Sequence, residues 1–144
     1  MTIWVLDTDH ISLFQRGYPL VVERVNSVSA KNLAVTIVTV EEQMYGRLNQ
    51  IKRAKNTDNL MEAYSKLKVT VNYFSSIEVL DFNEAAYSYY KQLLNQKIRI
   101  GAQDMKIAAI ALSINAIVVT RNKRDFAKIP NLIWEDWSII QENI

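Results

Sequence analysis

IWVLDTD, at residues 3–9, is a short apolar run that ends in a carboxylate. Four consecutive apolar residues without polar alternation are typical of a strand buried on both faces of a parallel sheet. Open α/β sheets bind their ligands beyond the carboxyl ends of the strands, so Asp7 stands where such folds keep their sites. The rest of the sequence determines which side chains join Asp7 there.

The composition of the chain indicates one globular domain over residues 1–144, because 49% of its residues are hydrophobic. Its 17 Lys and Arg residues nearly balance 15 Asp and Glu residues, so any nucleic-acid footprint must be local. Cysteine is absent, which excludes disulfides, zinc fingers and thiolate catalysis and suits the reducing cytoplasm. No signal peptide is visible, and no apolar run approaches the ~20 residues of a membrane span, so we expect a cytoplasmic protein without membrane contact.

Strand-like and helix-like segments alternate along the sequence. Apolar, β-branched runs predict strands at residues 3–6, 33–38, 77–80, 116–120 and 132–134. Segments between these runs show helical spacing of apolar residues. The alternation predicts an α/β fold with a central parallel sheet of about four to five strands and helices on both faces.

Capping residues and apolar stripes predict where the helices lie. Asp9 is expected to cap a short first helix, and Thr39 a helix that extends to about residue 55. Two apolar stripes are expected to face the core: Val40, Met44, Leu48 and Ile51 on one helix, and Leu60, Tyr64, Leu67, Val71 and Phe74 on the next.

Four acidic residues fall at the ends of predicted elements. Asp7 ends the first strand, Glu42 lies in the first turn of the helix after the second strand, Asp104 begins a later helix, and Asp125 follows the strand at 116–120. All these positions lie at one edge of a parallel sheet, so the carboxylates can converge. Like charges raise one another's pKa unless a cation lies among them, and oxygen ligands favour Mg²⁺ or Mn²⁺.

Each of these acids also has a structural interpretation. Asp104 and Glu42 would complement helix dipoles, and Asp125 would serve as a turn or cap residue. Asp7 is harder to explain in this way, because a carboxylate that ends a buried strand needs a partner.

Four motifs together resemble the PIN-domain ribonucleases, and most of all the VapC-type toxins of bacterial toxin–antitoxin pairs. They are LDTD at 6–9, VTVEEQMYG at 38–46, IGAQD at 100–104 and VVTRNKRDF at 118–126, followed by WEDW at 134–137. Each motif is weak by itself, but the four occur in order over nearly the whole chain.

The resemblance implies a metal-dependent endoribonuclease that cleaves RNA with a metal-activated water and leaves a 5′-phosphate. Carried over by position, Asp7, Glu42 and Asp104 hold Mg²⁺, with Mn²⁺ as the alternative ion, while Thr8 and Thr120 orient ligands or water. Glu42 is chosen over Glu41 because it stands four residues before a glycine, as the family's glutamate does. The implied partners are RNA (tRNA, rRNA or mRNA), a VapB-like antitoxin and a second copy of the chain.

The sequence departs from the family pattern at two positions. Asp9 stands where an asparagine is usual, and Asn122 stands where many members place a fourth acid. The fourth catalytic position is therefore left open between Asn122 and Asp125. Four basic residues near the motifs are expected to position the RNA backbone: Lys106, Arg121, Lys123 and Arg124.

Other functions stay open at the level of sequence. Asp7-x-Asp9 after a first strand also begins the haloacid-dehalogenase-like phosphatases, but the later acidic pair of that fold is missing. A receiver-like phosphoacceptor would need an acidic pair on the first strand, and this sequence does not have one there. A non-catalytic PIN-like scaffold that binds RNA or protein is the remaining alternative. His10 and the tyrosines at 87, 89 and 90 are interpreted as structural.

Overall fold

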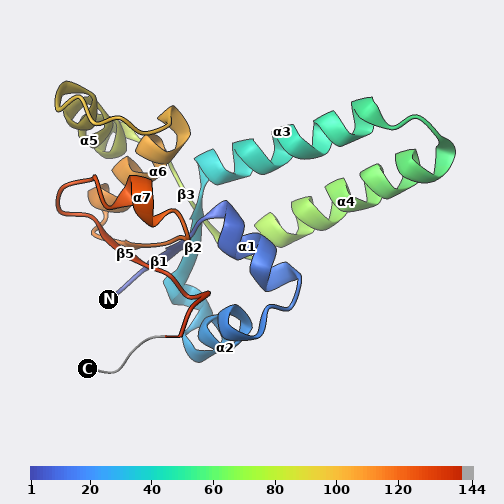
Figure 1. The fold of residues 1–144 in the computed structure, drawn as a ribbon, viewed down its shortest axis with the longest axis horizontal. Coiled ribbons are helices and arrows are strands. Elements are labelled where there is room, and N and C mark those ends of the chain that lie inside the picture. The colour runs from blue at the N-terminus through green and yellow to red at the C-terminus, as the bar shows by residue number, and fades with distance from the viewer. Residues whose placement is uncertain (141–144) are drawn as a thin grey trace.

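A five-stranded parallel sheet forms the centre of the computed structural model, which describes residues 1–140 (Figure 1). The strand order β3-β2-β1-β4-β5 puts the first strand in the middle, between β2 and β4. This confirms the predicted sheet. Its strands are β1 (Trp4–Leu6), β2 (Leu33–Thr36), β3 (Glu78–Leu80), β4 (Ile117–Val119) and β5 (Ile133–Glu135).

The strand order reverses between β1 and β4. The position of this reversal determines where a ligand site is expected. Successive strands run outward from β1 through β2 to β3, and the chain then returns to the other side of β1 for β4 and β5. Doubly wound sheets bind ligands at such a switch point, beyond the carboxyl ends of the strands. Asp7 follows β1 and Thr120 follows β4, so both residues lie at this crevice.

Helices cover both faces of the sheet, as predicted. Val5 packs into a core with α5 and α6, whereas its neighbour Leu6 faces the opposite core with α1, α2 and the buried Trp137. No helix within residues 1–140 is both long and apolar enough to cross a membrane. The helices are α1 (Thr8–Gln15), α2 (Pro19–Ser27), the 3-10 turn η1 (Ala30–Asn32), α3 (Ile37–Arg53), α4 (Thr57–Ser75), α5 (Glu84–Asn95), α6 (Ala102–Ser113) and α7 (Lys123–Phe126).

The pair α3–α4 forms an antiparallel arm that projects from the body (Figure 1). The predicted core stripes on these helices are only partly correct, because Val40 and Phe74 pack against the core but other members of the stripes are exposed. Leu48 is 51% exposed and Tyr64 is 55% exposed, while the buried residues of α4 are Ala63 and Thr70. In the arm, α3 and α4 pack mainly against each other. An apolar stripe on either helix therefore does not have to contact the sheet.

Two helices begin earlier than predicted, because a residue nearer the strand supplies the cap. The Thr36 hydroxyl accepts a hydrogen bond from the Thr39 amide at 3.1 Å, so β2 ends at Thr36 and α3 begins at Ile37. Glu42 consequently lies in the second turn of α3 and not in the first. In the same way Asp7, not Asp9, caps α1 through the Thr8 amide.

Candidate active site

Asp7 is held in place by both of its carboxylate oxygens. Oδ1 accepts a hydrogen bond from the Thr8 amide at 2.6 Å, and Oδ2 accepts one from the Thr120 hydroxyl at 2.8 Å. Thr120 is fully buried, and its oxygen also accepts the Asn122 amide hydrogen at 2.9 Å. The predicted supporting role of Thr120 therefore has a structural basis, because this side chain ties the end of β1 to the loop after β4.

Asp104 and Asp125 are joined by one neutral side chain. The amide Nδ2 of Asn122 donates to Asp104 Oδ2 and to Asp125 Oδ2, each at 3.1 Å. Its Oδ1 accepts the Asp125 amide hydrogen at 3.4 Å, which makes Asn122 the cap of α7. Asn122 therefore lies between the two acids, where it keeps their negative charges apart and adds none of its own.

Glu42 completes the acidic group from the side of α3. It is half-buried, and burial is the main cause that raises its pKa, followed by the charges of Asp7 and Asp104. Glu41, the alternative on the same helix, is exposed and instead accepts a hydrogen bond from Gln103 Nε2 at 2.9 Å. Of the two glutamates, Glu42 is thus the one whose charge is coupled to both Asp7 and Asp104.

Burial and mutual repulsion destabilise the ionised form of these carboxyl groups. Burial, with the nearby charge of Asp9, raises the pKa of Asp7 from 3.8 to about 6, although the hydrogen bonds from Thr120 and Thr8 act in the opposite direction. Burial and the charge of Asp125 likewise raise the pKa of Asp104. A cation placed among the three would relieve this repulsion.

The donor set fits a hard divalent ion. Asp7, Glu42 and Asp104 offer only oxygen, the ligand type that Mg²⁺ and Mn²⁺ prefer. Within residues 1–140, however, no group of three or more His, Asp or Glu side chains is placed to hold one ion together. Mg²⁺ is commonly bound through one or two carboxylates and keeps several of its waters, so its binding does not require all three side chains as direct ligands.

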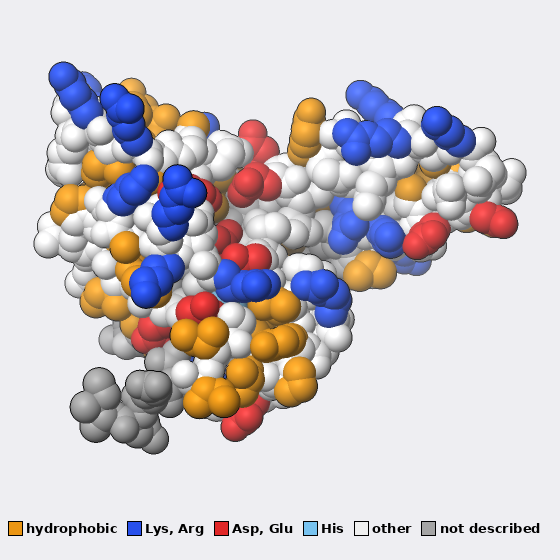
Figure 2. Space-filling model, viewed as in Figure 1, with side chains coloured by type: hydrophobic (Ala, Val, Ile, Leu, Met, Phe, Trp, Pro, Cys, Tyr) orange, Lys and Arg blue, Asp and Glu red, His pale blue; other side chains and the backbone are white. Residues whose placement is uncertain are grey.

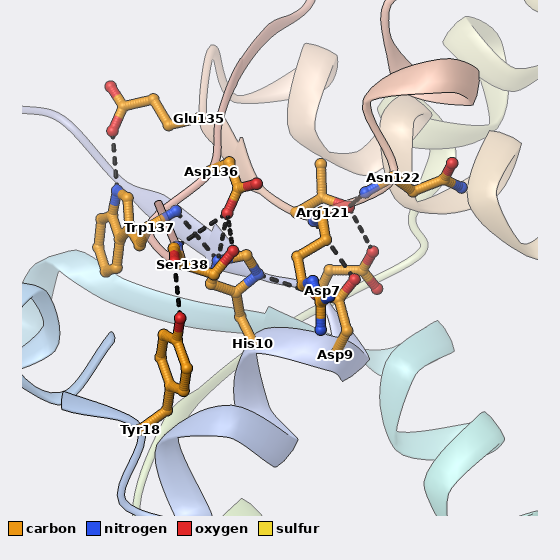
Figure 3. A network of polar contacts seen from close by, with 11 residues as sticks. Asp7, Asp9, His10, Tyr18, Arg121, Asn122, Glu135, Asp136, Trp137 and Ser138 are labelled. Carbon is orange, nitrogen blue, oxygen red and sulfur yellow. Dashed lines mark hydrogen bonds and ion pairs between the residues drawn. The ribbon is translucent and has the colours of Figure 1, made fainter. Parts of the chain in front are cut away.

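His10 links the site to the end of the described chain (Figure 3). The ring is fully buried, and its Nε2 accepts the Trp137 amide hydrogen at 3.1 Å, so the ring hydrogen is assigned to Nδ1. That hydrogen is donated to Asp9 Oδ1 at 2.8 Å, while Asp9 Oδ2 accepts the Arg121 amide hydrogen at 3.3 Å. His10 therefore has a structural role, as predicted, and orients a carboxylate beside Asp7.

Basic side chains flank the acidic group on both sides. Figure 2 shows acidic side chains gathered in the hollow between the body and the arm, with Lys and Arg on either flank. Arg121, Lys123 and Arg124 are exposed around the start of α7. Lys106 is half-buried on α6, where Nζ donates to Gln103 Oε1 at 3.3 Å.

Sequence reasoning missed two features of the site. The first is the link from His10 to Trp137, which joins residues 127 positions apart and leaves no local signal. The second is Arg47, which lines a hollow of about 350 Å³ together with Thr8 and Glu42. Arg47 stands five residues after Glu42, a spacing that does not make two helical side chains direct neighbours, so it gives no local signal for the second feature either.

Comparisons with known proteins extend over these same positions. A family model described as PIN domain matches residues 5–132, a range that contains all four acidic positions of the site. Ribonuclease VapC2 of Rickettsia felis is 36% identical over 114 residues, which are 75% of this chain and 78% of that protein. The tRNA(fMet)-specific endonuclease VapC of Salmonella typhimurium is 26% identical over 141 residues, which are 95% of this chain and 99% of that protein.

Solved structures show the same fold. A chain in the structure of VapBC-1 from nontypeable Haemophilus influenzae superposes with a TM-score of 0.78 at 27% sequence identity. The superposition covers 96% of this chain and 100% of that chain. The likeness therefore includes the arm as well as the sheet and the site.

Proposed function

Because the chain belongs to the PIN domain family, we propose that it is a metal-dependent endoribonuclease and the toxin of a toxin–antitoxin pair. The observation that carries this proposal is the convergence of Asp7, Glu42 and Asp104 at the switch point of the sheet, where burial and neighbouring charges raise the pKa of all three. The names of the relatives supply the reaction class, RNA cleavage. Residues 1–144 act as one unit in this proposal.

The metal would be held at Asp7, Glu42 and Asp104, by one or two of these carboxylates directly and by the others through waters that the ion keeps, with Mg²⁺ as the expected ion and Mn²⁺ as the alternative. Such an ion supplies Lewis-acid polarisation of the phosphodiester and lowers the pKa of water that attacks it. Thr120 and the Thr8 amide fix the two oxygens of Asp7, so the carboxylate enters the reaction without rearrangement.

The fourth position of the family pattern is divided between two side chains. Asn122 fixes Oδ2 of Asp104 and Oδ2 of Asp125 through its amide and contributes no charge. In our proposal Asp125 supplies the fourth acidic charge and Asn122 is a positioning residue. Asp125 also lies 3.9 Å from Lys128 Nζ, which offsets part of its charge on the side away from Asn122.

RNA is the proposed substrate, and basic side chains hold its backbone. Arg121, Lys123 and Arg124 are exposed around α7, and Lys106 lies on the neighbouring helix. Contacts of this kind attract phosphates without reading sequence. We propose a tRNA as the first substrate to test, because one relative is named a tRNA(fMet)-specific endonuclease.

A VapB-like antitoxin and a second copy of the chain are the proposed protein partners, and the cytoplasm is the proposed compartment. The antitoxin proposal rests on the similarity to a chain of a VapBC structure. Large apolar side chains on the arm are more than half exposed and leave a surface for such partners: Tyr45, Leu48, Met61 and Tyr64. Light scattering with and without a co-expressed antitoxin measures both associations.

Cleavage of a mixed tRNA and rRNA pool tests the nuclease. Purified protein would be incubated with Mg²⁺, with Mn²⁺ and with chelator, beside the variants Asp104→Asn and Asp81→Asn. Asp81 is an exposed carboxylate after β3 and controls for the change of charge. We expect discrete products that require the metal, a loss of about 100-fold or more in Asp104→Asn, and normal cleavage by Asp81→Asn.

Two results would contradict the proposal. Cleavage by folded Asp104→Asn at the wild-type rate would show that the metal site is wrongly assigned. If the wild-type protein cleaves no RNA with metal present and antitoxin removed, the non-catalytic scaffold is favoured. RNA binding by this inactive protein would then identify the scaffold as RNA-binding.

A further inference from the structure

A hollow beside the acidic site lies between the start of α1 and residues 42–50 of α3. It has a volume of about 350 Å³, which lies within the ~300–1,000 Å³ of ordinary ligand sites. Its lining comes from the start of α1 and from one face of α3: Thr8, Glu42, Gln43, Gly46, Arg47 and Gln50. Because Glu42 belongs to this lining, a molecule in the hollow would lie next to the reacting phosphodiester of the proposed function.

Arg47 is held in a fixed orientation at the wall of the hollow. Its Nε donates to Thr70 Oγ1 at 2.9 Å, and one terminal nitrogen donates to Gln50 Oε1 at 3.1 Å. Thr70 is itself buried and donates to the Lys66 carbonyl at 2.9 Å, so the anchor is rigid. Across residues 1–140 Arg47 makes no ion pair with a carboxylate, which leaves its remaining N–H donors for an anion.

Gly46 forms part of the same lining, in the middle of α3. A glycine inside a helix is less stable than an alanine, so its presence needs a reason. Packing supplies none, because a Cβ built at Gly46 meets nothing within 4 Å. The glycine leaves the backbone bare at the hollow, as expected where a ligand approaches closely.

Thr8 adds a third feature of a binding site. Thr8 lines the hollow, and its Oγ1 is buried and has no hydrogen-bond partner among the described residues. Buried polar groups are nearly always paired, so an unpaired hydroxyl at a hollow indicates a missing partner. Arg47, Gly46 and Thr8 all line the same hollow.

We propose that this hollow binds the segment of single-stranded RNA next to the scissile phosphodiester, with Arg47 on a phosphate and the sugar against Gly46. The inference rests on the proposed nuclease function and names a part of its substrate site. A guanidinium presents paired donors that match phosphate oxygens.

A second hollow lies next to this one on the arm. Gln50 lines both hollows, and the charged residues of the second are Arg53, Lys66 and Glu62. Glu62 is ion-paired with Lys66 at 3.3 Å, so Arg53 is the free charge there in the described chain. The three cations of the two linings outnumber the two carboxylates, Glu42 and Glu62, by one, and this net positive charge favours a polyanion over a protein segment.

Binding of a short fluorescein-labelled single-stranded RNA tests the proposal. The parent is full-length Asp104→Asn with Mg²⁺, and fluorescence anisotropy is measured over a range of salt concentrations. In this background Arg47→Ala should lower affinity about tenfold and reduce the salt slope by about 0.7, the value for one phosphate contact. Arg47→Lys should keep the salt slope of the parent, because the charge stays. It should recover only part of the affinity, because the paired N–H donors of the guanidinium are lost.

Two further variants separate binding from folding. Gly46→Ala should raise the melting temperature by about 3 °C, since helix propensity improves, and yet should weaken RNA binding. Lys52→Ala is the matched control, because it removes an exposed charge from the same helix outside the hollow. Its affinity should stay within about twofold of the parent.

The inference fails if folded Arg47→Ala and Gly46→Ala bind RNA like the parent. Loss of antitoxin binding by these same variants, with RNA binding intact, would assign the hollow to a protein segment and also overturn it. In both of these cases the wild-type protein would still cleave RNA. If the proposed nuclease function itself were wrong, the wild-type protein would cleave no RNA, so the two failures can be distinguished.

Discussion

Replacement of Asp7 by asparagine should stabilise the metal-free protein at neutral pH. Burial and Asp9 raise the pKa of Asp7 to about 6 in the folded protein, against 3.8 for an ordinary aspartate. The folded state therefore binds the proton more tightly than the unfolded state. The stability that this carboxyl contributes is fully present below about pH 4 and is lost as the pH rises through about 6.

The magnitude follows from the two pKa values and the hydrogen bonds. A difference of about 2.2 pKa units at 1.36 kcal/mol each means that ionised Asp7 costs about 3 kcal/mol at neutral pH. Asparagine avoids this cost and can still accept the Thr8 amide hydrogen. It cannot accept from the Thr120 hydroxyl, and that loss costs about 1 kcal/mol. The expected net gain is about 2 kcal/mol at pH 7.5, and it should fall to about zero near pH 4.5.

Urea denaturation in the presence of chelator, followed by circular dichroism, measures the net change in stability of Asp7→Asn at pH 7.5 and at pH 4.5. Asp81→Asn controls for the removal of one negative charge from the surface. Addition of Mg²⁺ should stabilise the wild type, by about 2.7 kcal/mol at a hundred times its Kd, and should stabilise Asp7→Asn much less. Equal effects of Asp7→Asn at the two pH values, or a loss of stability at pH 7.5, would refute the reasoning.

Three further variants probe other parts of the structure. Asn122→Asp adds a third carboxylate against Asp104 and Asp125, so its melting temperature should fall by about 4 °C in chelator and recover with Mg²⁺; scanning fluorimetry would contradict this if both values matched the wild type. His10→Ala empties a buried position and breaks its two hydrogen bonds, so urea denaturation should show a loss of about 2–4 kcal/mol, and a loss below about 1 kcal/mol would argue against the network. Tyr64→Ser changes an exposed face and should alter monomer stability by no more than about 0.5 kcal/mol, unlike a core residue.

Much of the fold is predictable because apolar runs determine it. The run at residues 3–6 has no polar alternation and forms the middle strand, and the run at 116–120 forms its neighbour. The placement of Asp7 at the carboxyl edge of the sheet follows from the same fact, since parallel strands end together, and Asp104 lies in the first turn of α6, the helix that leads into β4. No detailed packing is needed for either conclusion.

The failed predictions concern choices that depend on distant contacts. Thr36 and Thr39 are equally good capping residues, but Thr36 pairs with Leu80 in the sheet, and this pairing fixes where β2 ends. The stripe that contains Tyr64 has helical spacing, yet spacing does not say what the stripe meets. Its face is exposed because α4 belongs to an arm that leaves the sheet.

The hydrogen bond from Thr120 to Asp7 spans 113 positions of the chain, and this has a consequence during synthesis. β1 is made first but cannot acquire β4 as a neighbour until most of the chain has left the ribosome. At roughly 5–20 residues per second this interval lasts about 6–20 s. During that time the acidic group is not assembled, so a ribosome that makes an RNA-cleaving protein is spared its activity at least until β4 has been made.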